Sequence, residues 1–234
     1  KCDCAIMEMI NYTQKALPAS FGDLKSLVTL HVYTGQLEQL PLTIGNDHKL
    51  RMLAIIGNRL ESLPDNIGNL HTLMYFDIFN NRIRSLPIST GNLKNLRRLN
   101  VARNKLTSLP DSVGKLKNLY ALFVSNNRLI SLPDSVGKLL NLIHFEASKN
   151  RLTFLPDSVG NLKNLIWLYA WNNTLTSLPK TVGNMKSLID VDVRHNGLTD
   201  LPSSVSQWNN IEYLYLAGNP LCANLNIPSN LKGA

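Results

Sequence analysis

A repeat of 23 residues constrains this chain more than any other feature. An aliphatic residue recurs at that interval without insertion or deletion, at Leu27, Leu50, Leu73, Leu96, Leu119, Leu142, Leu165, Leu188 and Ile211. A strict period of this length is typical of a solenoid, in which each unit packs only against its neighbours. The repeats fill the chain, so we expect one continuous domain.

Each unit combines a strand pattern with a short helical return. The first, fourth and sixth positions are apolar throughout, as in Leu119, Leu122 and Val124, and this period of two predicts a β-strand. A Leu-Pro pair follows, and proline suits the first turn of a short α- or 3₁₀-helix. Asp47 replaces a core Leu, which predicts looser packing there. The ninth position is asparagine in eight repeats: Asn58, Asn81, Asn104, Asn127, Asn150, Asn173, Asn196 and Asn219. We expect these side chains to be buried and hydrogen-bonded to the backbone.

The pattern L-x-x-L-x-L-x-x-N-x-L resembles the leucine-rich-repeat superfamily. The resemblance implies an α/β fold, a right-handed solenoid of β and α or 3₁₀ segments with a concave parallel sheet of about nine strands. We expect an N-terminal cap at 1–26, eight repeats at 27–210, and the last repeat with a C-terminal cap at 211–234.

Two subgroups share features with the chain. The return segment L-P-x-x-[IV]-G-x-L resembles the Ras-scaffold leucine-rich proteins and the plant Ras-group repeats, which are intracellular scaffolds. The terminal G-N-P-L-C at 218–222 resembles the C-terminal cap of receptor-like ectodomains of plants and oomycetes. We favour the extracellular or membrane-tethered alternative over the cytoplasmic one.

Aromatic residues gather on the strand positions that face the concave surface. The third, fifth and seventh positions hold nine of the 16 aromatic residues of the chain: Tyr33, Tyr75, Phe79, Phe123, Trp167, Tyr169, Trp171, Tyr213 and Tyr215. Polar residues flank them, namely Arg98, His144, Glu146, Asp190, Asp192 and Arg194. Exposed aromatic patches usually mark an interface, so these fifteen residues are our candidate site for a protein or peptide ligand.

The aromatic columns predict two clusters. Tyr33, Tyr75 and Phe79, together with Ile56, form the first, and the aromatics from Phe123 onward form the second. Three alternatives to a protein ligand remain open. The rings could stack on sugars, they could stiffen the sheet by cross-strand pairing, or the solenoid could be a spacer whose concave face binds nothing.

The net charge is 24 − 16 = +8, with a pI near 9.5. Such a balance fits an acidic partner, and it fits plain solubility equally well. The tenth position forms a basic row, which either binds an acidic or anionic partner or is a solvated loop edge: Arg59, Arg82, Lys105, Arg128 and Arg151. A second row, which we interpret as solvation, consists of Lys94, Lys117, Lys163 and Lys186.

No motif in the sequence indicates catalysis. It has no phosphate loop, zincin motif or nucleotide fingerprint, and His144, Glu146 and Ser148 share one strand without an oriented nucleophile and base. We therefore predict a binding protein without enzymatic activity, cofactor, metal or specific nucleic-acid partner. No apolar run approaches the ~18 residues of a membrane span.

The cysteines and sequons bear on the compartment. Cys2 and Cys4 are too close in sequence for a relaxed disulfide, and Cys222 lies eight repeats away, so these thiols are not expected to pair. Cys222 is either free or paired with a cysteine beyond Ala234. Asn11 and Asn172 begin glycosylation sequons, which are used only in a secreted protein.

Overall fold

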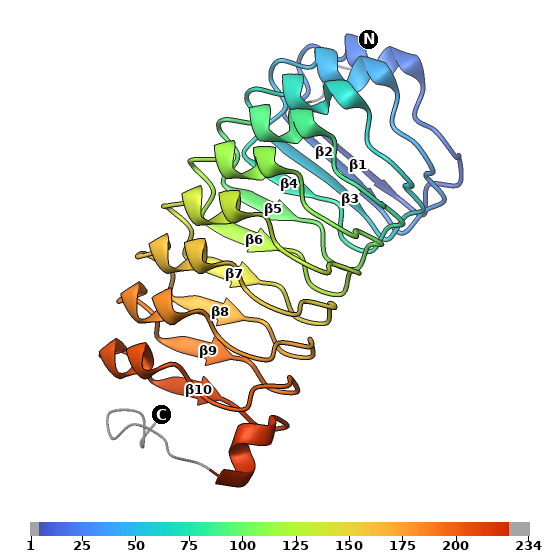
Figure 1. Ribbon diagram of the computed structural model, residues 1–234. Coiled ribbons are helices and arrows are strands. Elements are labelled where there is room, and N and C mark those ends of the chain that lie inside the picture. Colours follow the sequence, from blue (N-terminus) through green and yellow to red (C-terminus); the bar gives the residue numbers. More distant parts are fainter. Residues whose placement is uncertain (1–4, 225–234) are drawn as a thin grey trace.

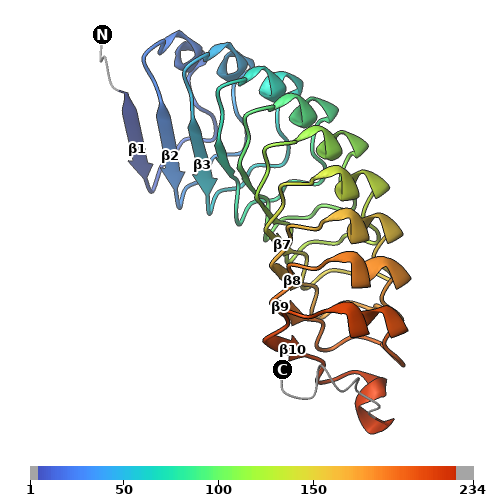
Figure 2. The same cartoon turned by 90° about the vertical axis from the view of Figure 1, so that its left-hand side faces the viewer.

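The computed structural model describes residues 5–224, which form one curved stack of coils (Figure 1). Ten parallel strands make a single sheet in chain order, and each strand is followed by a five-residue 3₁₀ helix. The predicted leucine-rich-repeat solenoid is confirmed, and the return segments are 3₁₀ rather than α-helical. The strands line the inner side of the arc and the 3₁₀ helices its outer side (Figure 2).

The element bounds repeat with the 23-residue period. The strands are β1 (Ile6–Ile10), β2 (Thr29–Tyr33), β3 (Met52–Ile56), β4 (Tyr75–Asp77), β5 (Arg98–Asn100), β6 (Ala121–Phe123), β7 (His144–Glu146), β8 (Trp167–Tyr169), β9 (Asp190–Asp192) and β10 (Tyr213–Tyr215). The 3₁₀ helices are η1 (Ala19–Asp23), η2 (Leu42–Asn46), η3 (Asp65–Asn69), η4 (Ile88–Asn92), η5 (Asp111–Lys115), η6 (Asp134–Lys138), η7 (Asp157–Asn161), η8 (Lys180–Asn184), η9 (Ser203–Gln207) and η10 (Pro220–Asn224).

The described sheet has one strand more than the nine that the leucine spacing predicts. The additional strand, β1, comes from the N-terminal segment and pairs in parallel with β2, from Ile6 opposite Thr29 to Ile10 opposite Tyr33. Met7 and Met9 pack against the core in the places that leucine and valine take in β2. The leucine pattern misses this strand because methionine supplies its inward face.

The ninth-position asparagines form the expected ladder, buried in every coil except at the half-buried Asn127 and Asn150. In Asn104 the side-chain oxygen accepts the backbone N–H of Ile83 at 2.9 Å, and the amide nitrogen donates to the carbonyl oxygens of Ile78 at 2.9 Å and Val101 at 3.1 Å. One amide therefore bonds to its own coil and to the preceding one. Because these hydrogen bonds are buried, they fix the spacing of the coils.

Asp47 marks the weaker packing that the sequence predicts on the outer side. Its side chain is buried, and its Oδ1 accepts the backbone N–H groups of Lys49 at 2.9 Å and Leu50 at 3.1 Å. Burial raises the pKa of this carboxyl above its ordinary value. Helix η2 contacts η3 less extensively than each later 3₁₀ helix, from η3 to η8, contacts the next one.

Candidate ligand-binding face

The centre of the concave face is a cluster of rings around His144. The imidazole lies edge-on to Phe123, with centroids 4.8 Å apart, and edge-on to Tyr169 at 5.5 Å. Trp167 covers it from the next strand at 5.6 Å. Strands β6, β7 and β8 supply these four rings in register, so the sheet itself fixes their separation.

His144 is held as a neutral ring at neutral pH. Burial is the main cause that lowers its pKa, and the charge of Arg98 acts in the same direction, while Glu146 and Asp190 oppose them. The Nε2 atom is covered and has no hydrogen-bond partner among the described residues. Above it, Trp167 keeps 38% of its surface exposed. The cluster therefore presents an aromatic outer surface, and the imidazole below it is half-buried and uncharged.

Acidic residues next to this cluster are already paired. The hydroxyl of Tyr169 donates to Oδ2 of Asp190 at 2.8 Å. Burial and this hydrogen bond, together with the charge of Asp190, raise the pKa of Tyr169 far above its ordinary value, so the phenol stays protonated. Arg194 binds the buried carboxylate of Asp192 through two nitrogens, at 2.7 and 3.0 Å.

The C-terminal end of the face continues the aromatic surface. The guanidinium of Arg194 lies 4.9 Å from the ring centre of Tyr215. Tyr215 in turn stacks on Tyr213, with ring planes 7° apart and centroids at 6.3 Å. Both tyrosines are exposed. The two rings thus stand beside the paired Asp192 without covering the central cluster.

A hollow of about 410 Å³ lies next to the central cluster. Phe79, Phe123 and Trp171 supply its aromatic walls. A cation lies over each wall, with Arg103 at 5.4 Å from Phe79, Arg98 at 4.9 Å from Phe123 and Lys149 at 4.7 Å from Trp171. Such contacts hold long, flexible cations at fixed places. With three cations and one acid, Glu146, in its lining, the hollow combines aromatic walls with a net positive charge.

Arg103 and Lys149 are functional candidates that the strand columns do not include. Both occupy the eighth position, where the backbone is left-handed, with φ of 53° in each. Asn or Gly, which tolerate that conformation, occupy the eighth position at Gly57, Asn80, Asn126, Asn172 and Gly218. A long basic residue there is the sequence signal that could have identified them.

The predicted N-terminal aromatic cluster is not a set of ring contacts. In the described part of the chain, the Tyr33 hydroxyl lies 3.1 Å from Nδ1 of His31, Phe79 meets Arg103, and Tyr75 shares a side-chain hydrogen bond with Tyr120. Each ring therefore contacts a different neighbour. The structure brings together the second predicted cluster at Phe123, His144, Trp167 and Tyr169, but it leaves Trp171 in the hollow.

The other predicted positions lie away from this face. The tenth-position row from Arg59 to Arg151 is exposed apart from the half-buried Lys105 and enters no ion pair among residues 5–224. Cys222 is a free, half-buried thiol that donates to the Leu216 carbonyl, whereas Cys2 and Cys4 lie outside the described residues.

In the described part of the chain, no group of three or more His, Cys, Asp or Glu is placed to hold a metal ion, and no helix is long and apolar enough to cross a membrane.

Comparison with known proteins agrees with this architecture. Residues 89–177 match the model of a leucine-rich repeat region, whereas curated protein sequences give no significant match. The chain thus has a leucine-rich-repeat fold and is structurally similar to plant receptor ectodomains. Repeats of this kind are typically non-catalytic binding modules.

Several solved structures share the fold. The ectodomain of the Arabidopsis thaliana membrane receptor kinase GASSHO1/SCHENGEN3, in complex with CASPARIAN STRIP INTEGRITY FACTOR 2, is 27% identical with a TM-score of 0.81, over 91% of this chain and 27% of that one. A TDR receptor is 27% identical with a TM-score of 0.69, over 89% and 42%. A chain of the Drosophila Toll–Spatzle complex is 26% identical with a TM-score of 0.73, over 87% and 28%. The chain therefore spans less than half of each of these chains.

Proposed function

We propose that this protein recognises a protein or peptide ligand on its concave face, as a secreted or receptor-like ectodomain. The observation that carries the proposal is the ring cluster around His144, whose outermost member, Trp167, is still 38% exposed. The core below is filled by leucine, valine and phenylalanine, so it does not require these rings. A partly exposed tryptophan above half-buried aromatic rings is the kind of anchor that dominates protein interfaces.

The arrangement of charge supports a polypeptide ligand. Arg194 neutralises Asp192 and the Tyr169 hydroxyl donates to Oδ2 of Asp190, which leaves only the covered Oδ1 of Asp190 without a partner among the described residues. In the hollow beside Trp171, Arg103 and Lys149 enter no ion pair among residues 5–224, so their N–H groups are available to acceptors. A ligand with an apolar side chain for the rings and a carboxylate or carbonyl group for the hollow satisfies both regions.

The similarity to solved structures also supports a protein or peptide ligand. The ectodomain of GASSHO1/SCHENGEN3 and a chain of the Toll–Spatzle complex, each solved with a protein or peptide partner, share the solenoid at 26–27% identity. Because the present chain spans 27–28% of those chains, the likeness supports the class of function and leaves the ligand unspecified.

The test compares two variants in affinity capture from extracellular and cytosolic fractions. Trp167→Ala/Trp171→Ala removes two rings from the face, and Phe154→Ala removes a ring that is 51% exposed in a loop outside the face. We expect partners that are captured by the wild type and by Phe154→Ala and lost by the double variant. With the purified partner, each hot-spot ring should be worth ~2 kcal/mol, or roughly 30-fold in Kd.

Equal capture by all three proteins would exclude the concave rings as the binding surface. Glycosylation supplies a second criterion, because Asn172 is exposed and directly follows Trp171. An intact-mass measurement of the secreted protein that finds a glycan on Asn172 would count against a ligand at this end of the face. A glycan on Asn11 alone supports secretion and leaves the face open.

A further inference from the structure

The net positive charge of the protein is concentrated on one flank. In the seven coils from η2 to η8, the helix-to-strand flank comprises the last residue of the 3₁₀ helix and the five residues that lead to the next strand, at 46–51, 69–74, 92–97, 115–120, 138–143, 161–166 and 184–189. It holds nine Lys and Arg and a single acid, Asp47, hence 9 − 1 = +8. The remainder has 24 − 9 = 15 basic and 16 − 1 = 15 acidic residues, so the rest of the chain is neutral.

The cations of this flank are not neutralised by the protein. The ion pairs within residues 5–224 are Lys15–Glu38, Arg98–Asp77 and Arg194–Asp192, and none of them includes a flank residue. The one flank acid, Asp47, is buried against its own backbone. Unpaired like charges on one side of a molecule create a field that attracts polyanions.

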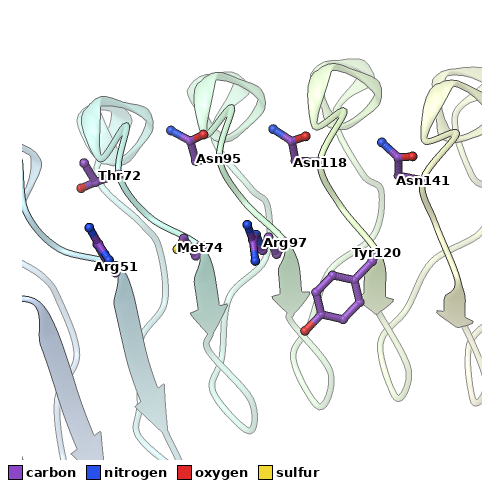
Figure 3. A pocket seen from close by; sticks show the side chains of 8 residues that line it. All are labelled: Arg51, Thr72, Met74, Asn95, Arg97, Asn118, Tyr120 and Asn141. Atoms are coloured by element: carbon purple, nitrogen blue, oxygen red, sulfur yellow. The ribbon is translucent and has the colours of Figure 1, made fainter.

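The flank is hollowed along the solenoid axis. A groove of about 530 Å³ crosses four coils, with Arg51, Met74, Arg97 and Tyr120 along one side (Figure 3). The opposite side is a row of short polar side chains, Thr72, Asn95, Asn118 and Asn141. A second hollow, of about 640 Å³, includes Lys117, Lys138 and Lys163 of the following coils.

The asparagine row presents hydrogen-bond acceptors to this groove. The amide nitrogens donate to carbonyl oxygens of the preceding coil, from Asn95 to His71 at 2.7 Å and from Asn118 to Lys94 at 2.8 Å. Asn141 repeats the pattern at 2.8 Å. No donor of the described residues reaches the side-chain oxygens, so each of these three coils adds one free acceptor to the row.

We infer that the helix-to-strand flank binds an anionic polysaccharide whose chain runs along the groove across successive coils. Such a polymer carries carboxylate or sulfate groups for Arg51 and Arg97, and hydroxyl donors for the asparagine oxygens. Guanidinium groups bind such oxyanions in a planar, bidentate geometry. The exposed ring of Tyr120 adds an apolar surface at the same depth.

Two other polyanions fit this groove less well. A DNA backbone offers only acceptors to the acceptor row, and single-stranded nucleic acids bind mainly by stacking on several aromatic rings, whereas Tyr120 is the one aromatic residue of the flank sequence. An extended acidic peptide offers one backbone N–H donor and one carbonyl acceptor per residue, whereas each sugar unit offers several hydroxyl donors to the asparagine oxygens.

The test measures the Kd of a heparin-derived oligosaccharide by titration calorimetry with the full chain. Arg51→Gln/Arg97→Gln removes two groove cations, and Arg59→Gln/Arg82→Gln removes two exposed cations of the tenth-position row. Both pairs change the net charge equally. We expect the groove pair to weaken binding by about tenfold or more and the control pair by less than about twofold. The salt dependence should flatten only in the groove pair, because fewer counterions are released.

The outcomes separate this inference from the function proposed for the concave face. Heparin binding should persist in Trp167→Ala/Trp171→Ala, and polygalacturonate should compete whereas uncharged dextran should not. Equal loss in the two arginine pairs would show that net charge, and not the groove, attracts the polymer. Single-stranded DNA or poly-glutamate that binds as tightly as heparin at equal charge would overturn the assignment to a polysaccharide.

Discussion

The stacking of coils on the outer side requires glycine, and Gly160→Ala tests this requirement. Gly160 lies in η7 and is buried. A Cβ atom added there would lie 2.5 Å from both the carbonyl oxygen and the Cβ of Thr181 in η8. Neither atom is free to move, because η8 is itself packed on η9, where Gly183 faces Ser204 in the same way. The substitution therefore pushes two coils apart.

The size of the effect follows from two opposing terms. Overpacking of a close-packed site costs about 1–3 kcal/mol. Alanine restricts the unfolded chain and returns about 0.4–1 kcal/mol. We expect a net loss of about 1–2 kcal/mol in the free energy of unfolding, which lowers Tm by roughly 2–8 °C in a domain of this size. Urea unfolding followed by circular dichroism measures it, with an unchanged m-value.

Gly197→Ala is the matched control. There the nearest atom to an added Cβ is the Leu175 carbonyl oxygen, at 3.3 Å, and the backbone N–H that bonds to that oxygen is retained. The expected change is within about 0.5 kcal/mol. If Gly160→Ala unfolds at the same urea concentration as Gly197→Ala, close approach is not the reason for glycine in the return segments.

Two further predictions concern buried polar groups. Asn104→Ala leaves the Ile83 N–H and the Ile78 and Val101 carbonyl groups without their side-chain partner, and should cost about 2–4 kcal/mol in urea unfolding; a loss below about 1 kcal/mol would contradict the role of the ladder. Burial raises the folded-state pKa of Asp47. The protonated carboxyl therefore stabilises the fold below the unfolded pKa of about 3.9, and this stabilisation is lost as the pH rises through the folded pKa. Asp47→Asn, whose side chain carries no charge, should therefore raise Tm at pH 7. Thermal scans should show the gain shrinking toward pH 4, and a gain that is equal at both pH values would refute the titration.

The repeating framework of this protein could be predicted residue by residue. The leucine positions, the asparagine ladder and the curved parallel sheet follow from a 23-residue period, because each coil interacts mainly with its neighbours. The prediction was incomplete at the N-terminus, where β1 buries Met7 and Met9 in place of leucine and valine. It also left the return segments between α and 3₁₀, which differ by one residue per hydrogen-bonded turn.

The candidate site was less predictable than the framework. Outward columns can be written from the strand period, but a column does not say which rings touch. His144 joins Phe123, Trp167 and Tyr169 through side-chain directions on three strands. Trp171, although in the same columns, turns instead toward Lys149.

The sequence by itself determined the solenoid, its register and the set of residues available to the concave face, because an uninterrupted period leaves the chain one way to bury its leucines. The tertiary structure alone decided which of those residues meet. It placed Arg103 and Lys149 over aromatic walls, used Asp190 and Asp192 to hold neighbouring side chains, and hollowed the basic flank into a groove along Arg51 and Arg97. The physical reason is that stacking brings residues 23 apart to about 4.8 Å, so short-range contacts and electrostatic fields are set between coils rather than along the chain.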